Sequence, residues 1–263
     1  EISTGLQISG HFSRMIKIVI LGAGNVAGHL FKAFQATENI EVVQVYNRSE
    51  TALEDFKSET AITTHLADLK DAAIYLVCVK DDAIKEIISR LAHKEGIIAH
   101  TSGSVPLSTS AKRNAVFYPL QTFSKQKEVN FQEIPFCLET SEEKDFSLLE
   151  KLAKSVSEKV FSISSEQRQK LHLAAVFANN FSNHMFAIAE DLCAQHQVPF
   201  EVLSALIKET AQKATQNSPK EVQTGPAKRN DQATIKQHLA QLNNADYKEI
   251  YKLLTQSIKN KNG

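Results

Sequence analysis

The feature that most constrains the fold is an apolar run that passes directly into a glycine-rich turn. Residues 16–21 read Ile-Lys-Ile-Val-Ile-Leu, and residues 22–28 read Gly-Ala-Gly-Asn-Val-Ala-Gly. The turn opens a stretch with apolar side chains at helical spacing, which includes Leu30 and Phe34. A buried strand, a glycine turn and an amphipathic helix in succession predict the first unit of a parallel α/β sheet that binds a nucleotide.

The small residues of this turn each suit a bound dinucleotide. Gly22 permits the tight turn, and Gly24 lets the backbone approach a pyrophosphate. Ala27 or Gly28 allows the helix to pack closely on the strand, and the helix start offers backbone N–H groups to phosphates. The alternative is a glycine turn that binds nothing. The cofactor contacts expected here are Gly22, Gly24, Asn25, Val26 and Ala27.

The end of the second predicted strand indicates which dinucleotide binds. An NAD-specific fold usually has an acidic residue there, which accepts hydrogen bonds from the adenosine ribose. This chain has Asn47, Arg48 and Ser49 instead. Arg48 can pair with a 2′-phosphate, and Ser49 can donate a hydrogen bond, so the sequence favours NADP(H) over NAD(H). The alternative is a helix N-cap beside a solvated arginine.

The rest of the chain divides into an α/β half and a helical half. Strands are predicted at 16–21, 41–46, 74–79, 97–100, 114–117, 134–138 and 159–163, and helices at 25–37, 50–58, 81–93 and 143–156. From residue 164 the periodicity is helical, with one long helix at 165–196, a polar loop at 216–231, and closing helices at 232–242 and 245–259. We expect an NADP-binding Rossmann domain over 15–163 and an all-α substrate and dimerisation domain over 164–263. Residues 1–14 are interpreted as a cloning remnant or a loose extension, with native translation starting at Met15.

Composition excludes several classes of function. The 30 basic and 30 acidic side chains balance, so no net charge favours nucleic acid or an anionic membrane. No apolar run approaches the roughly 20 residues that a membrane span needs. Cys78, Cys137 and Cys193 lie far apart, without metal-ligand or disulfide spacing, and no metal site is expected. We expect a cytoplasmic protein.

Three segments resemble the superfamily of 6-phosphogluconate dehydrogenase, the β-hydroxyacid dehydrogenases and pyrroline-5-carboxylate reductase. They are 77–84 (Val-Cys-Val-Lys-Asp-Asp-Ala-Ile), 98–104 (Ile-Ala-His-Thr-Ser-Gly-Ser) and 117–123 (Phe-Tyr-Pro-Leu-Gln-Thr-Phe). The resemblance implies that Val79 and Lys80 lie beside the nicotinamide ribose and that Ser102 faces the substrate. It also implies a homodimer formed through the helical domain.

The segment 117–123, together with 224–231 (Thr-Gly-Pro-Ala-Lys-Arg-Asn-Asp), resembles a bacterial Rossmann-like family with a helical domain of unknown function. Members of that family are described as candidate NADP oxidoreductases. This chain departs from the family by having Tyr118 where histidine is frequent and Asn230 where glycine is common. Fold-level resemblance does not identify a reaction, because one fold hosts many chemistries.

The long helix carries the candidate catalytic residues. The resembled dehydrogenases have a lysine followed four residues later by asparagine, but here Lys170 is followed by Ala174. His172, Asn179, Asn183 and Glu190 are spaced by 7, 4 and 7 residues and would share one face of an α-helix. Imidazole suits a proton donor or an orienting group because it titrates near neutrality. The alternative is a polar stripe that is satisfied by helix packing or in a dimer interface.

Two further residues are candidates for substrate contact. Ser102 follows a sheet strand, where open α/β folds bind ligands, and could hold a carboxylate or carbonyl oxygen; otherwise it shapes a Ser-Gly turn. Arg229 could clamp a carboxylate or phosphate bidentately, and the nearby Asp231 could cap the next helix.

These patterns predict an oxidoreductase that moves a hydride between NADP(H) and a C=O or C=N carbon of a small anionic substrate. A non-catalytic NADP(H)-binding sensor is the first alternative, motivated by the missing Lys-Asn pair. A structural dimerisation module is the second, and a deazaflavin could replace the organic substrate.

Overall fold

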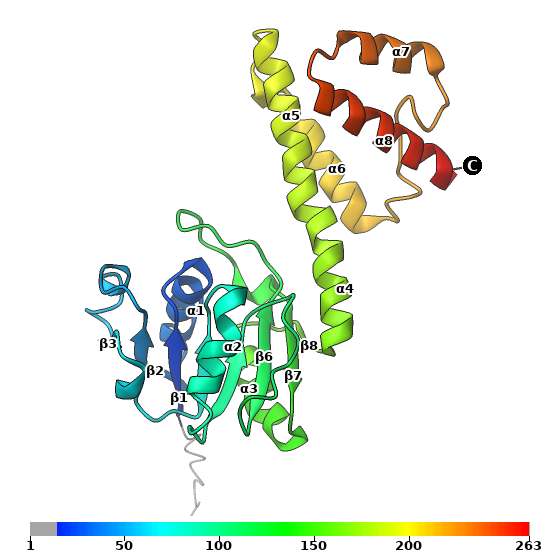
Figure 1. Ribbon diagram of the computed structural model, residues 1–263. Coiled ribbons are helices and arrows are strands. Elements are labelled where there is room, and N and C mark those ends of the chain that lie inside the picture. The colour runs from blue at the N-terminus through cyan, green and yellow to red at the C-terminus, as the bar shows by residue number, and fades with distance from the viewer. Residues whose placement is uncertain (1–14, 263) are drawn as a thin grey trace, which may run out of the picture. The chain divides into compact units, whose positions relative to one another are not determined.

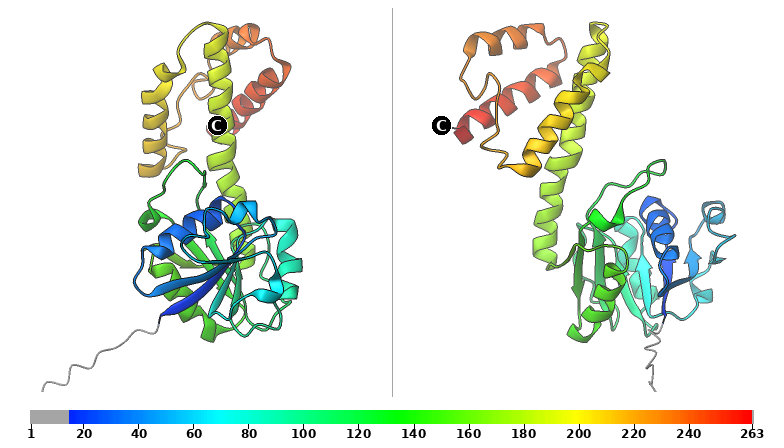
Figure 2. Two further views of the ribbon diagram at one scale, coloured as in Figure 1. Left: turned by 90° about the vertical axis from the view of Figure 1, so that its left-hand side faces the viewer. Right: turned by 180° about the vertical axis from the view of Figure 1, so that it is seen from behind.

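The computed structural model describes residues 15–262, which form two compact units (Figures 1 and 2). The first unit ends at Ala175 and the second begins at Val176. The extension predicted at residues 1–14 lies outside the described residues. The predicted domain boundary lies earlier in the chain, between residues 163 and 164. The sequence shows where the chain changes from strands to helices, whereas the division into units reflects where the packing changes.

The first unit is built on an eight-stranded sheet in the order β3-β2-β1-β4-β5-β6-β7-β8. The strands are β1 (Ile16–Leu21), β2 (Ile40–Tyr46), β3 (Ala61–Thr63), β4 (Ile74–Val77), β5 (Ile97–His100), β6 (Asn114–Pro119), β7 (Phe136–Thr140) and β8 (Val160–Ser162). All neighbours are parallel except β6 and β7, which are antiparallel. The order of the first six strands is that of a Rossmann fold, so the predicted α/β class is confirmed.

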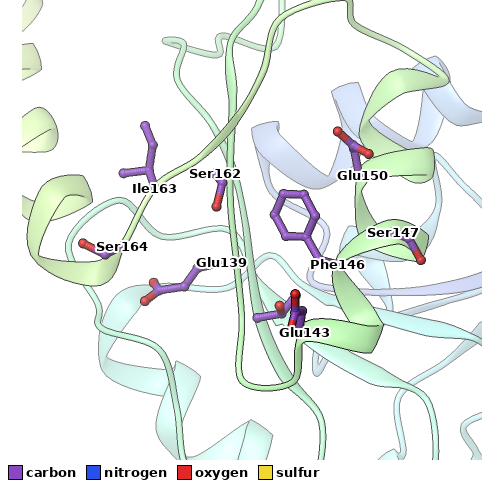
Figure 3. Close-up of a pocket in the computed structure, with 9 residues that line it drawn as sticks. Glu139, Glu143, Phe146, Ser147, Glu150, Ser162, Ile163 and Ser164 are labelled. Atoms are coloured by element: carbon purple, nitrogen blue, oxygen red, sulfur yellow. The ribbon is translucent and has the colours of Figure 1, made fainter.

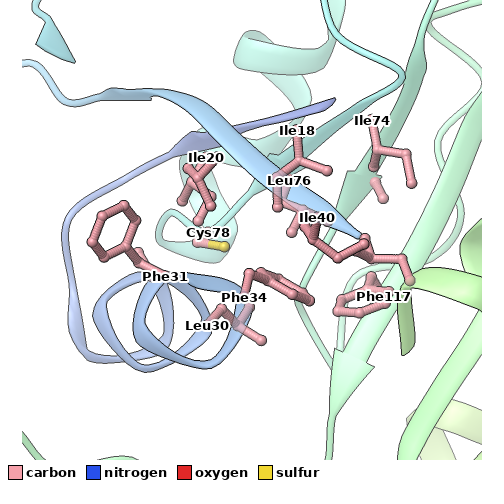
Figure 4. Close-up of a cluster of buried hydrophobic side chains, with 14 of the residues drawn as sticks. Ile18, Ile20, Leu30, Phe31, Phe34, Ile40, Ile74, Leu76, Cys78 and Phe117 are labelled. Carbon is pink, nitrogen blue, oxygen red and sulfur yellow. The ribbon is translucent and has the colours of Figure 1, made fainter. Parts of the chain in front are cut away.

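Helices cover both faces of this sheet. They are α1 (Asn25–Gln35), α2 (Asp81–Arg90) and α3 (Glu143–Lys154), and a fourth helix, α4 (Ser165–Ala175), follows β8 at the end of this unit. Alternate residues of β1 face opposite sides: Ile18 and Ile20 pack with α1 and α3, whereas Val19 and Leu21 pack with α2. Figure 4 shows the first of these two cores, to which α1 contributes Leu30, Phe31 and Phe34 among others. Strands buried on both faces explain the continuous apolar runs of the sequence.

The edge of the sheet beyond β2 differs from the prediction. Residues 50–58 were expected to form a helix, but only a 3-10 turn at Thr51–Leu53 forms, followed by further turns. Leu53 and Phe56 are the only buried side chains of that stretch, which is too few to hold a full helix against the sheet. The three-residue strand β3 pairs with β2 beyond this segment and has no predicted counterpart.

The second unit is entirely helical among the residues that the structure describes, as the sequence predicts. It contains a π-helical segment (Val176–Phe181), α5 (Ser182–Gln195), a 3-10 turn (Phe200–Leu203), α6 (Ser204–Gln216), α7 (Gln232–Gln241) and α8 (Ala245–Asn262). The predicted helix at 165–196 is thus helical throughout but not uniformly α. Ser182 Oγ donates to the Phe177 carbonyl at 3.2 Å, which satisfies one backbone acceptor at the π segment. Within residues 15–262, no helix is both long and apolar enough to span a bilayer.

Candidate functional site

The glycine-rich turn lies where β1 ends beside β4. Gly22 has φ +114°, and a Cβ there would lie 2.2 Å from the Cys78 carbonyl oxygen, so only glycine fits. The Gly22 N–H donates to the Tyr46 carbonyl at 2.7 Å, which ties the turn to the end of β2 as well. A Cβ at Gly24 would meet nothing within 4 Å. The turn is therefore fixed by its neighbours at Gly22 and open at Gly24, which leaves room for a phosphate group against the backbone.

The start of α1 is connected to the loop that follows β6. No side chain caps this helix, so its first N–H groups are not used by a cap. The Asn25 side-chain amide donates to the Phe123 carbonyl at 3.0 Å, and the ring nitrogens of His29 lie 2.8 Å from the Asn25 carbonyl and 3.0 Å from the Lys127 carbonyl. The Asn25 side chain is therefore used to hold the loop, and the backbone N–H of Asn25 is the group that a phosphate could contact.

The end of β2 presents an unpaired cation. Asn47 Nδ2 donates to the Ser49 carbonyl at 3.1 Å, which shapes a tight turn around Arg48. Arg48 and Ser49 are exposed, and in the described part of the chain Arg48 makes no hydrogen bond or ion pair. An arginine held at the end of β2 without a partner is available to an anionic ligand.

The end of β4 is joined to the loop after β5. Val79 lies beside the turn, with its Cγ1 3.4 Å from the Cβ position of Gly22, and Lys80 is exposed just before α2. Ser104 Oγ donates a short hydrogen bond to the Asp81 carboxylate. This bond connects two of the segments that the sequence places at the site.

Ser102 uses its hydroxyl within its own loop. Its Oγ accepts from the N–H groups of Ser104 at 3.2 Å and Val105 at 3.1 Å, and the residue is buried. This geometry corresponds to the turn-shaping alternative, and a contact between Ser102 and substrate remains a prediction.

His100 is a neutral, structural histidine below that loop. Its Nδ1 accepts from the Ser102 N–H at 3.2 Å, so Nε2 carries the proton and donates to the Pro106 carbonyl at 3.2 Å. Burial, and secondarily the positive charge of Arg168, lowers the pKa of His100 to about 4. Its ring therefore holds the loop in place without carrying charge at neutral pH.

Tyr118 and His172 meet above Gly103. The Tyr118 hydroxyl lies 3.2 Å from His172 Nδ1, and the two rings meet edge to face with centroids 6.2 Å apart. A Cβ on Gly103 would lie 2.6 Å from Tyr118 Cζ and 2.7 Å from His172 Nδ1. The absent side chain of Gly103 is thus what allows the two rings to approach. The sequence indicates His172 but not its partner, since Tyr118 is far away in the chain and stands where the resembled family frequently has histidine.

A buried arginine fixes the helix that carries His172. Arg168 is 0% exposed, forms an ion pair with Glu139 and donates to the Val105 carbonyl at 2.7 Å. Ser165 Oγ donates to the same Glu139 carboxylate at 2.7 Å. Because His172 lies four residues after Arg168, it is on the same side of α4. The role of Arg168 could not be predicted, since no sequence pattern separates a buried arginine from a surface one.

The predicted polar stripe is divided by the π-helical segment. His172 lies on α4 in the first unit, Asn179 lies within the π segment, and Asn183 and Glu190 lie on α5. The 7-4-7 spacing places residues on one face only if every turn is α-helical, and a π turn adds a residue that rotates later positions by about 100°. Asn183 and Glu190, seven residues apart, share a face of α5.

In the loop before α7, Asp231 has the helix-capping role that the sequence suggested for it. Asp231 caps α7, accepting from the Thr234 N–H at 3.1 Å. Asn230 has φ +53°, a left-handed conformation that explains why glycine is common there and why asparagine is tolerated. Arg229 is exposed in this loop and helps to lower the pKa of Asp231, after the hydrogen bonds from Thr234.

A separate cleft with a volume of about 610 Å³ lies between α3 and the segment after β8 (Figure 3). Glu139, Glu143 and Glu150 line it, together with serine side chains. Because β7 is antiparallel to β6, its carboxyl end, where Glu139 lies, is at the opposite edge of the sheet from the glycine turn. Among the described residues, no three or more His, Cys, Asp or Glu side chains are grouped so that they could hold a metal ion.

Two family models match the chain. Residues 17–102 match the family described as NADP oxidoreductase, coenzyme F420-dependent, and residues 134–258 match a domain of unknown function, DUF2520. No functionally curated protein matches.

Several solved structures are similar over almost the whole chain. A candidate NADP oxidoreductase from Bacteroides fragilis is 40% identical, with a TM-score of 0.86 over 94% of this chain and 99% of that one. A protein from Thermotoga maritima is 20% identical, with a TM-score of 0.70 over 93% and 98%. The 1-pyrroline-5-carboxylate reductase from Streptococcus pyogenes is 14% identical, with a TM-score of 0.60 over 94% and 99%. The last two likenesses show a shared fold.

Proposed function

This chain belongs to the family of the Bacteroides fragilis candidate NADP oxidoreductase, and from that premise we propose that it is an NADP(H)-dependent oxidoreductase. The reaction is hydride transfer to or from a C=O or C=N carbon of a small anionic substrate. One observation carries the proposal: the open glycine turn lies at the end of β1 beside β4, where the strand order reverses, and Arg48 at the end of neighbouring β2 has no partner among the described residues. Open α/β sheets bind dinucleotides at this position.

The residues present fit the cofactor. Gly24 leaves the backbone accessible to a pyrophosphate, and Arg48 with Ser49 offers charge and a hydroxyl to a 2′-phosphate. Val79 and Lys80 would lie along the nicotinamide half. The cofactor supplies the hydride, and the protein supplies orientation and management of the proton.

We assign to His172 the role of hydrogen-bond or proton donor to the reacting oxygen or nitrogen of the substrate. His172 is half-buried, held by Tyr118, and carried by the helix that Arg168 fixes to the sheet unit. Imidazole can donate a hydrogen bond or a proton to the oxygen or nitrogen that gains charge as hydride arrives.

Four further residues are proposed as substrate contacts. They are Ser102 in the sheet unit and Asn179, Asn183 and Arg229 in the helical unit. Amide and guanidinium groups would suit a carboxylate on the substrate. If these side chains bind substrate, replacing each one by alanine should raise KM in an NADPH-oxidation assay with small carbonyl and imine acids.

We also propose that the protein is a homodimer formed through its helical unit. The supporting observation is that this unit leaves large apolar side chains exposed, among them Val202, Leu206 and Leu253. Sedimentation equilibrium at micromolar concentration should give twice the mass of 29.2 kDa. A monomer across the whole concentration range would contradict the dimer.

Fluorescence titration with NADPH and NADH tests the cofactor. We expect NADPH to bind more tightly, and Arg48→Ala to weaken NADPH about tenfold or more while leaving NADH unchanged, because a charge-assisted phosphate contact is lost. Arg90→Ala, an exposed arginine on α2, is the matched control and should behave as wild type. Failure of both nucleotides to bind would overturn the proposal.

Turnover is tested by NADPH oxidation with a panel of small carbonyl and imine acids: glyoxylate, pyruvate, succinic semialdehyde and 1-pyrroline-5-carboxylate. Reduction of any member, slowed about a hundredfold in His172→Gln, supports the oxidoreductase. Tight NADPH binding without turnover on a broader panel would instead support the non-catalytic sensor.

A further inference from the structure

The contact between Tyr118 and His172 decides which ring nitrogen of the histidine is left for chemistry. Tyr118 Oη lies 3.2 Å from Nδ1, and the two rings occupy the space that a side chain at Gly103 would need. Nδ1 is therefore occupied inside the protein. Nε2 of His172 has no hydrogen-bond partner in the described part of the chain.

The direction of that hydrogen bond follows from the protonation of the phenol. Burial raises the pKa of Tyr118 to about 12, with smaller contributions of both signs from Cys137, Arg168 and Asp81. The phenol thus keeps its proton at neutral pH and donates a hydrogen bond to His172 Nδ1. A neutral imidazole that accepts at Nδ1 carries its own proton on Nε2.

We propose that Tyr118 is a positioning residue that keeps His172 in the Nε2–H tautomer and orients its ring. This inference rests on the proposed function, in which His172 serves the reacting heteroatom. With the proton on Nε2, the ring donates a hydrogen bond to the substrate's oxygen or nitrogen as negative charge develops there. Without Tyr118 the two tautomers would compete, and the wrong one presents a lone pair that repels the developing charge.

The chain contains a matched control for this pair. Tyr251 Oη lies 2.9 Å from His238 Nδ1, with ring centroids 5.8 Å apart in the same edge-to-face arrangement. This second pair joins α7 and α8 in the helical unit and has no part in the proposed reaction. Tyr251→Phe therefore removes the same chemical contact elsewhere in the protein.

The primary experiment is ¹⁵N NMR of histidine-labelled protein, which distinguishes the tautomers by the shifts of Nδ1 and Nε2. In wild type, His172 should be the Nε2–H form, and Tyr118→Phe should move it toward a mixture. Tyr251→Phe should alter the signals of His238 and leave those of His172 unchanged. Unchanged His172 shifts in Tyr118→Phe would overturn the proposal, whether or not the protein turns over any substrate.

Kinetics with the panel of carbonyl and imine acids supply the second readout. Tyr118→Phe should lower kcat about three- to tenfold, the weight of one ordinary hydrogen bond, with NADPH affinity and KM unchanged. In a His172→Gln background the same change should have no further effect, because Tyr118 acts through His172. An equal loss in that background would show that Tyr118 acts independently and would contradict the proposal. Wild-type protein that binds NADPH but reduces nothing, with the tautomer shift intact, would refute the proposed function alone.

Discussion

The sheet unit and the helical unit differ in how they bury apolar side chains. The sheet unit has two cores, one on each face, in which most members are fully enclosed. In the helical unit, the buried apolar residues among those described are Ala227, Ile235 and Leu242. Its large exposed ones are Phe177, Phe181, Phe186, Val198, Val202, Leu206, Leu253 and Leu254.

The two units therefore differ in where their stability comes from. Burial of apolar surface contributes roughly 25 cal/mol per Å², and the sheet unit collects it within one chain. Helices are stabilised mainly by packing an apolar face, and the helical unit has little such packing of its own. We therefore expect substitutions in the sheet unit to act on folding and those on the exposed helical side chains to act on association.

The largest expected effect is at the tightest point of the sheet unit. Gly22→Ala should lower the free energy of unfolding by about 3 kcal/mol, because the new Cβ meets the Cys78 carbonyl and the positive φ disfavours alanine. Urea denaturation measures it. Gly24→Ala is the control: it has open space, so it should keep its stability while NADPH binding weakens. Equal stability of the two variants would show that the turn is not constrained as described.

A smaller effect is expected from acid. The folded-state pKa of His100 is lowered from 6.5 to about 4, so between these values the unfolded chain binds the extra proton and stability falls as pH falls. Moving from pH 7.5 to pH 5 should cost about 2 kcal/mol through this residue. Urea midpoints of wild type and His100→Gln at both pH values measure the difference. Parallel pH dependence in the two proteins would assign the acid sensitivity to other groups.

Substitution of an exposed apolar residue in the helical unit should have the smallest effect on folding. It should nevertheless weaken dimerisation. Leu253 is 73% exposed on α8, so Leu253→Glu removes no intrachain core. If a second copy covers this side chain, its charge should weaken the dimer about tenfold or more. Phe161→Glu, an exposed apolar residue of β8, is the control in the sheet unit. Sedimentation of Leu253→Glu like wild type would remove Leu253 from the interface.

The sequence predicted the parts of the fold that depend on local pattern. The strand at 16–21, the strand at 97–100 and the start of α1 were located to the residue, because apolar runs and a glycine turn mark their ends. The 3-10 turn at Thr51–Leu53 and the π segment at Val176–Phe181 were missed. Each has ordinary helical composition, and only packing decides which hydrogen-bond pattern forms.

The candidate site divides in the same way. The glycine turn and Arg48 are adjacent in sequence to the strands that present them, so their roles could be predicted. The partner of His172 could not, because Tyr118 comes from another strand and the contact requires the absence of a side chain at Gly103. Nor could the burial of Arg168, whose ion pair with Glu139 spans distant parts of the chain.

The antiparallel pairing of β6 and β7 limits how many residues can separate Arg168 from His172. Because β8 follows β7, α4 begins beside Glu139, toward the edge of the sheet opposite the glycine turn, and must run along the sheet before His172 meets Tyr118. A single residue inserted between Arg168 and His172 would turn the imidazole by about 100° around the helix axis and advance it by about 1.5 Å. Both residues would survive such an insertion and still fail to meet their partners together. The number of residues between Arg168 and His172 is therefore as tightly constrained as the identities of these two residues.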